Sequence, residues 1–118
     1  MMAAAIGGFL SVAAGAFAAH GIKDPQAADW MRTGALYGFV HCLATFACAQ
    51  FMSLGASRAR LAPAFFLPGV VIFSGTLYAM ALGAPHWFGA ITPIGGVLFL
   101  IGWAVLAWSA LEIDRPRP

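Results

Sequence analysis

Residues 67–103 read LPGVVIFSGTLYAMALGAPHWFGAITPIGGVLFLIGW and contain no Lys, Arg, Asp or Glu. They belong to an uncharged run of 51 residues that extends from Leu61 to Leu111. A helix needs about 20 apolar residues to cross a hydrocarbon core about 30 Å thick, so this run is long enough for two spans. The segment GAPHWFG, residues 83–89, predicts the break between them, because it has two glycines, a proline and an interfacial tryptophan.

The rest of the chain divides in the same way. Residues 1–22 carry no Lys, Arg, Asp or Glu, and neither do residues 33–57. Each of these stretches fits one more span. The sequence therefore predicts an all-α protein, a four-helix transmembrane bundle with antiparallel neighbours and short loops. Residues 1–118 would form a single integral membrane domain, with spans at about 2–20, 25–54, 63–83 and 92–112.

The composition agrees with a membrane protein and argues against a soluble one. The chain has 118 residues, of which 62% are hydrophobic and 8% charged. Soluble domains have about 25% charged residues, and so short a chain could not bury this much apolar surface in its own core. The lipid bilayer is therefore the expected partner. The formal net charge is +2 and the basic residues are scattered, so no nucleic-acid partner is expected.

Two helix starts are marked by a capping residue followed by proline, at Asp24-Pro25 and at Thr92-Pro93. Gly21 is a candidate C-cap of the first helix. An alternative is that the N-terminal segment is a signal peptide cleaved near AFAAHG, but it lacks the basic residues that normally begin one.

The distribution of Lys and Arg predicts the orientation in the membrane. With four spans, the second loop and the two termini share a side that holds four arginines, Arg58, Arg60, Arg115 and Arg117. The other side holds Lys23 and Arg32. The positive-inside rule then places both termini in the cytoplasm.

Small residues recur along three of the predicted helices at the spacing of a helix-packing seam. In lipid, helices associate through close packing of small side chains and a few hydrogen bonds. The predicted seam residues are Ala4, Gly8, Ser11, Gly15 and Ala18 in the first helix, Gly69, Thr76 and Gly83 in the third, and Gly95, Gly102 and Ser109 in the fourth.

The second helix carries a polar stripe instead. Six side chains recur at steps of three or four residues and fall on one face: Trp30, Thr33, Tyr37, His41, Thr45 and Cys48. The opposite face has Leu36, Phe39, Leu43 and Phe46 and is expected to meet lipid. We therefore expect His41 to point into the bundle.

A histidine inside a membrane protein is a functional candidate by default, but it can also simply join helices. We expect a neutral His41 ring whose N–H finds an acceptor on Ser74, Thr76 or Tyr78, or on a backbone carbonyl. The predicted intramembrane polar cluster is Tyr37, His41, Thr45, Ser74, Thr76 and Tyr78. Structural bonding between helices is the preferred interpretation, and a proton relay remains the alternative.

No metal site, cofactor site or catalytic residue is predicted. His20 and His86 would both lie at the outer face, far above His41, and no metal-binding spacing occurs. Cys42 and Cys48 are too far apart on one helix to form a disulfide. The spans hold no carboxylate, and their serines have no evident base. Trp30, Arg32 and Trp87 are expected to anchor the chain at the interface.

Four segments resemble the signature segments of a family of small membrane proteins, the domain of unknown function 423 family, whose animal relatives are called transmembrane protein 256. They are GAFAAHG, WMRTGALYGFVH, IFSGTLYAMAL and ITPIGGVLFLIGW, residues 15–21, 30–41, 72–82 and 91–103. The family usually has glycine where this chain has Ala18 and serine where it has Thr76. The resemblance implies a four-span protein of the bacterial inner membrane and no particular reaction.

The expected function is that of a non-enzymatic membrane protein, an accessory or assembly subunit that associates through its helices with a larger membrane complex or with itself. The alternative is a small oligomeric transporter or channel with a polar path along the second helix.

Overall fold

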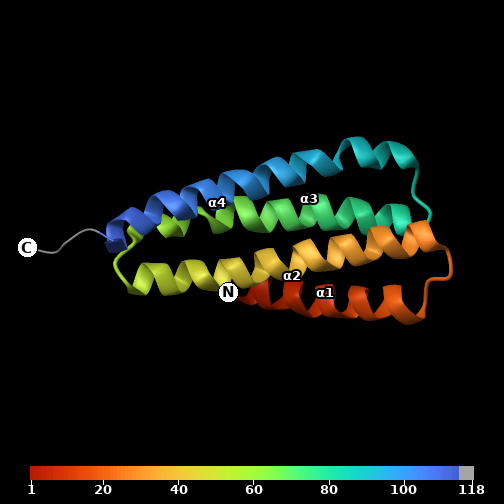
Figure 1. Ribbon diagram of the computed structural model, residues 1–118, viewed down its shortest axis with the longest axis horizontal. Coiled ribbons are helices and arrows are strands. Elements are labelled where there is room, and N and C mark those ends of the chain that lie inside the picture. Colours follow the sequence, from red (N-terminus) through yellow and green to blue (C-terminus); the bar gives the residue numbers. More distant parts are fainter. Residues whose placement is uncertain (115–118) are drawn as a thin grey trace, which may run out of the picture.

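The computed structural model describes residues 1–114, which form four long helices that alternate in direction (Figure 1). These are α1 (Met2–His20), α2 (Pro25–Ser53), α3 (Pro63–Ala81) and α4 (Thr92–Asp114). Two short 3₁₀ turns, η1 (Ser57–Leu61) and η2 (His86–Ala90), precede α3 and α4. All four helices are long and apolar enough to cross a membrane. The predicted all-α transmembrane bundle with antiparallel neighbours and short loops is confirmed.

The helices lie in the order α1, α2, α3, α4, and each packs mainly against the next one along the chain (Figure 1). Contacts between α2 and α4 and between α1 and α3 are much less extensive, and within residues 1–114 α1 does not contact α4. The bundle is therefore open: α2 and α3 form its middle, and α1 and α4 lie at its two edges.

The start of α2 follows from its sequence. Asp24 has an extended backbone, and its carboxylate accepts a hydrogen bond of 2.9 Å from the backbone nitrogen of Ala27. Pro25 is the first helical residue, as predicted. Thr92 differs from the prediction, because its hydroxyl lies 2.6 Å from that of Thr76 and thereby links α4 to α3.

Two glycines end helices by adopting a left-handed backbone, which disfavours any side chain. Gly55 follows α2 with φ 99°, and Gly83 follows α3 with φ 108°. In each case the next residue donates its backbone N–H to a carbonyl five positions earlier, Ala56 to Phe51 and Ala84 to Ala79. Gly83 therefore lies in a turn and not in the packing seam where the sequence placed it.

The α3–α4 contact contains three of the predicted seam glycines. A Cβ atom on Gly95 would lie 2.6 Å from the backbone nitrogen of Phe73 and 2.9 Å from the carbonyl of Gly69. A Cβ atom on Gly102 would lie 2.5 Å from the Phe66 ring. These glycines bring the two backbones so close that no side chain fits between them.

The α1–α2 contact corrects the seam predicted for the first helix. Ser11 is buried there, but a Cβ atom on Gly8 would meet nothing within 4 Å, and one on Gly15 would make an ordinary contact of 3.7 Å with Ala35. The close approach occurs instead at Gly7, where a Cβ atom would lie 2.5 Å from the Cys42 sulfur. The regular spacing of small residues does not reveal which member of the pair Gly7-Gly8 faces α2.

The end of the bundle where α2 joins α3 is tied to the last turn of α4. The Glu112 carboxylate accepts hydrogen bonds from the backbone nitrogens of Ser57 (3.0 Å) and Arg58 (3.2 Å) and from the Ser57 hydroxyl (3.1 Å). It also forms an ion pair of 3.2 Å with the Arg58 guanidinium, which lies 4.1 Å from the centre of the Trp108 ring. Of the other arginines predicted on this side of the membrane, Arg60 is exposed, while Arg115 and Arg117 lie outside the described residues.

Candidate functional site

His41 lies near the middle of α2, and its side chain is buried between α2 and α4, with 4% exposed. Its Nδ1 atom is 2.6 Å from the backbone carbonyl of Tyr37, one turn earlier. Its Nε2 atom is 2.9 Å from the indole nitrogen of Trp103 on α4. Both ring nitrogens of His41 therefore have a hydrogen-bond partner.

These two partners determine how the His41 ring is protonated. A carbonyl can only accept a hydrogen bond, so Nδ1 carries the hydrogen and donates it to Tyr37. An indole N–H can only donate, so Nε2 is unprotonated and accepts from Trp103. An imidazolium would place the N–H of Nε2 against the N–H of Trp103. The geometry accordingly fits one neutral tautomer, and the acceptor is the backbone carbonyl, one of the candidates named from the sequence.

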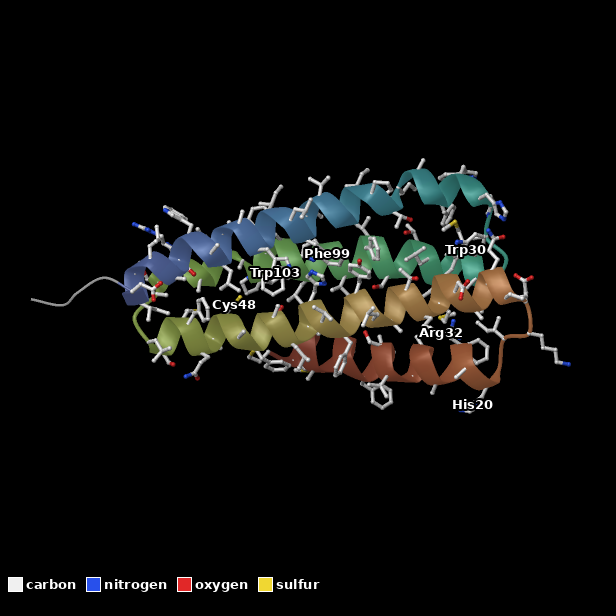
Figure 2. The ribbon with its side chains drawn as sticks, viewed as in Figure 1. His20, Trp30, Arg32, Cys48, Phe99 and Trp103 are labelled. Atoms are coloured by element: carbon white, nitrogen blue, oxygen red, sulfur yellow. The ribbon has the colours of Figure 1, made fainter. Side chains whose placement is uncertain are left out.

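Aromatic rings enclose His41. Its ring stacks on Phe99 with a centroid distance of 3.6 Å and an angle of 8° between the planes. Phe66 lies 5.5 Å away in a tilted arrangement, and Trp103 meets the ring nearly at right angles. Figure 2 shows Phe99 and Trp103 next to each other in the strip between α4 and α2. Within the predicted polar cluster, the Tyr37 ring lies nearly parallel to that of His41 at a centroid distance of 6.2 Å.

The polar cluster predicted from the sequence is divided into separate groups. Thr45 donates to the carbonyl of His41 within α2 and is buried. Thr76 joins Thr92 at the α3–α4 contact. Tyr37 contributes its carbonyl to His41, and its side chain is 43% exposed although its ring packs against Phe73 of α3 at 4.9 Å.

A second group lies where α1, α2 and α3 meet, and it consists of the hydroxyls of Ser11, Ser74 and Tyr78. They gather around Gly38, where a Cβ atom would lie 2.6 Å from the Ser11 oxygen, 3.1 Å from the Ser74 oxygen and 3.7 Å from the Tyr78 oxygen. Ser11 donates to the carbonyl of Gly7 (2.8 Å), and Ser74 donates across to the carbonyl of Gly34 on α2 (2.6 Å). We call these three side chains the hydroxyl cluster.

Sequence reasoning missed three residues that matter here. Trp103 and Phe99 hold His41 from α4, and Glu112 ties α4 to η1. The sequence held only part of the signal for Trp103: an indole N–H inside a membrane needs an acceptor, but the sequence does not show which acceptor lies at the same depth. Glu112 could have been noticed as an acidic residue near the arginines of the second loop.

The predicted interface anchors Trp30, Arg32 and Trp87 lie at the end of the bundle that contains η2. Trp30 is half-buried and packs edge-on against the His86 ring at 5.3 Å, and Arg32 forms an exposed ion pair of 2.9 Å with Asp29. Trp87 is exposed. Figure 2 shows His20, Trp30 and Arg32 at this same end of the molecule. Among residues 1–114, no three His, Cys, Asp or Glu side chains come together in a way that could hold a metal ion.

Apolar grooves run along the outer surfaces of the helices, and two of them contain side chains of the predicted polar cluster. The α2–α4 groove has a volume of about 700 Å³, and its lining includes Leu36, Val40, Gly96 and Leu100, with Phe73 of α3 contributing as well. The α1–α3 groove has a volume of about 450 Å³, and its lining includes Gly75 and the hydroxyl cluster.

Comparisons with known proteins identify the family. The family model described as protein of unknown function DUF423 matches residues 14–96. The chain is 43% identical over 111 residues to a UPF0382 membrane protein of Haemophilus influenzae, covering 92% of this chain and 90% of the relative. It is 40% identical over 116 residues to the UPF0382 inner membrane protein YgdD of Escherichia coli, covering 95% and 88%. This chain belongs to the DUF423 family.

Membership of the DUF423 family confirms the resemblance seen in the sequence. A further UPF0382 membrane protein, from Staphylococcus epidermidis, is 36% identical over 92% of this chain and 91% of its own length. No solved structure matches the chain. The relatives are named membrane or inner membrane proteins, and the chain has four candidate spans. This DUF423 protein is therefore a multi-pass protein of the bacterial inner membrane, embedded in the lipid bilayer.

Proposed function

We propose that this DUF423 protein is a non-enzymatic accessory subunit that binds a transmembrane helix of another membrane protein in its α2–α4 groove. The observation that carries the proposal is Gly96, a glycine in the interior of α4 at which a Cβ atom would meet nothing within 4 Å. Gly96 lines the groove, next to apolar side chains of both α2 and α4.

Packing within the chain explains why a glycine is needed at Gly95, but it does not explain the glycine at Gly96. Gly95 has no room for a side chain because α3 lies against it, whereas Gly96 has free space. A glycine inside a helix is less favourable than alanine by about 1 kcal/mol in soluble hosts. Small residues on the surface of a membrane helix allow the backbone of another helix to approach closely. A helix seated in the α2–α4 groove would use the space at Gly96.

The arrangement of the polar groups supports a role in helix association better than a catalytic or proton-relay role. Both His41 nitrogens are engaged and the ring is enclosed by Phe66, Phe99 and Trp103. A general base or proton relay needs a ring nitrogen that can reach a substrate or a water. The alternative of transport along α2 has less support, because His41, the hydroxyl cluster and the Thr76–Thr92 pair form separate groups and not a continuous path.

The proposed orientation has both termini in the cytoplasm. It rests on the positive-inside rule, since Arg58 and Arg60 lie in the η1 connection and Lys23 lies at the opposite end. With this orientation the groove would be reached sideways from the lipid, by a helix that spans the same membrane.

The test compares two glycines that both have free space. Gly96→Leu fills the α2–α4 groove, and Gly75→Leu, at another glycine whose Cβ position is open, fills the α1–α3 groove. Each variant is expressed at native level, extracted gently and weighed by native mass spectrometry. We expect the wild type and Gly75→Leu to carry a partner of defined mass and stoichiometry, and Gly96→Leu to have lost it. A wild type found only as a free monomer, or equal association of both variants, would contradict the proposal; a doubled mass would identify a second copy as the partner.

A further inference from the structure

The α1–α3 groove has a polar group at its floor that packing within the chain does not explain. The Tyr78 hydroxyl oxygen is buried, and no hydrogen-bond partner for it is found among residues 1–114. The hydroxyls of Ser11 and Ser74 lie close enough to interact with it, but neither forms a hydrogen bond of normal geometry with it. Both of these are 4% exposed or less. A buried hydroxyl without a hydrogen-bond partner destabilises a protein by about 1–3 kcal/mol. The presence of such a hydroxyl at this position therefore calls for an explanation.

The hydrogen-bonding capacity of the cluster indicates what it can bind. Ser11 and Ser74 have already donated their hydrogens to the carbonyls of Gly7 and Gly34. Of the three hydroxyls, Tyr78 is therefore the one whose hydrogen is in no hydrogen bond of normal geometry. A matching ligand group must accept a hydrogen bond, which an uncharged carbonyl or hydroxyl oxygen can do.

The depth of the hydroxyl cluster in the membrane further limits which ligands can reach it. Ser11 lies nine residues into α1, about 14 Å from the start of that helix, and α1 has 19 residues. The cluster is thus close to the middle of a hydrocarbon core about 30 Å thick. The ester carbonyls of a phospholipid stay near its charged headgroup at the membrane surface, because moving that headgroup to this depth is strongly unfavourable. The ligand must lack a charged headgroup.

The groove provides space for the rest of such a molecule. Its volume of about 450 Å³ lies within the range of small-molecule sites, and it is far larger than a single water molecule, which occupies about 30 Å³. Alkyl side chains from both helices line it, among them Ile6, Leu10, Leu67 and Val70. Gly75 lies next to Ser74 and leaves its Cβ position open, so a flat group can lie against the α3 backbone there.

We propose that the α1–α3 groove binds a neutral, lipid-soluble molecule without a charged headgroup, whose carbonyl or hydroxyl oxygen accepts a hydrogen bond from Tyr78. The Tyr78 oxygen lies beneath the groove surface, so the ligand reaches it through a small displacement of α1. Among the helices, α1 is the one with the smallest buried share of its span, and it packs mainly against α2, so it can move without disturbing the α3–α4 contact. This site is independent of the partner proposed for the α2–α4 groove.

The test measures binding to the full chain in lipid nanodiscs with three probes. Decylubiquinone supplies carbonyl oxygens, farnesol supplies a hydroxyl, and dioleoylphosphatidylglycerol supplies ester carbonyls with a charged headgroup. A ligand that binds only the folded state raises the midpoint of thermal unfolding. We expect decylubiquinone or farnesol to raise it in the wild type and in the matched control Gly96→Leu, and to have no effect on Gly75→Leu, in which the groove is filled.

Tyr78→Phe separates binding from stability. It removes the hydroxyl but keeps the ring, which lies against Gly34. We expect its unliganded midpoint to equal or exceed that of the wild type, because a buried group without a partner is lost, and its affinity for the neutral probe to fall about 3- to 20-fold, the loss of one hydrogen bond in a membrane. Binding of the phospholipid probe only, no binding of either neutral probe, equal responses of Gly75→Leu and Gly96→Leu, or an unchanged affinity in Tyr78→Phe would each overturn the proposal.

Discussion

The hydrogen bond between His41 and Trp103 can be measured with a double-mutant cycle. His41→Phe keeps a flat ring against Phe99 but removes both nitrogens. Trp103→Phe removes the indole N–H that lies 2.9 Å from Nε2. If the two side chains are bonded, the double variant should be less destabilised than the sum of the two single variants.

The structure also indicates how large the effects should be. Interhelical hydrogen bonds in membranes average about 0.6 kcal/mol and reach about 1.7 kcal/mol, and this range is the expected coupling energy. His41→Leu loses the stacking on Phe99 as well, which is worth about 0.5–1.5 kcal/mol for aromatic pairs. We therefore expect His41→Leu to be destabilised by about 1–3 kcal/mol. His41→Gln should lose less of the hydrogen bonding, because an amide can still accept from Trp103 and donate to the Tyr37 carbonyl.

The assay is reversible unfolding in mixed detergent micelles, followed by circular dichroism so that loss of a tryptophan does not alter the signal. Mutations that do not interact add within about 0.3–0.5 kcal/mol. A coupling energy below that value would refute the bonded arrangement of His41 and Trp103. A stable His41→Gln protein that fails to restore the phenotype of a deletion strain would show that the histidine does more than join α2 to α4.

The other predictions concern packing, the η1 connection and orientation. Gly95→Leu and Gly102→Leu should lower the thermal midpoint strongly in detergent, whereas Gly15→Ala should leave it within error, because only Gly15 has an ordinary contact distance to its neighbour; similar midpoints for all three would contradict the packing described. Glu112→Gln should speed trypsin cleavage within the η1 connection, since the ion pair to Arg58 is lost, while Asp114→Asn serves as control; equal cleavage rates would show that the Glu112 contacts do not hold the connection. A reporter active only in the cytoplasm should work when fused to the C-terminus, and activity of a periplasm-only reporter at that site would reverse the orientation.

The fold could be predicted because lipid imposes long, uncharged helices, and the charges and turn residues of this chain show where they stop. The Asp24-Pro25 start was visible in the sequence, but the role of Thr92 was not, because its hydroxyl is taken by Thr76 from another helix. Periodicity correctly indicated that His41 turns away from the exposed Phe39. It could not indicate that Trp103 would be the partner, since that depends on the relative depth of α2 and α4.

The polar cluster shows the same limit. The sequence pattern predicts one cluster for the polar residues of α2 and α3, because the two helices are expected to be neighbours. The structure separates them, because His41 packs against Phe66 of α3 and Phe99 of α4, whereas Ser74 bonds to the carbonyl of Gly34. The rotation of α1 about its axis decides whether Gly7 or Gly8 faces the neighbouring helix. A seven-residue spacing of small residues does not determine this rotation.

The order of the helices has a consequence for synthesis. Since α1, α2, α3 and α4 pack chiefly in the order in which they are made, each can dock on its predecessor as it leaves the ribosome and enters the bilayer, with no need to wait for the last one. The Nε2 atom of His41 stays unpartnered until α4 is made, because it receives its hydrogen bond from Trp103. A nascent chain stalled after α3 should thus hold its first three helices together while the Nε2 atom of His41 stays exposed, a feature by which membrane chaperones or proteases could tell an unfinished chain from a complete one.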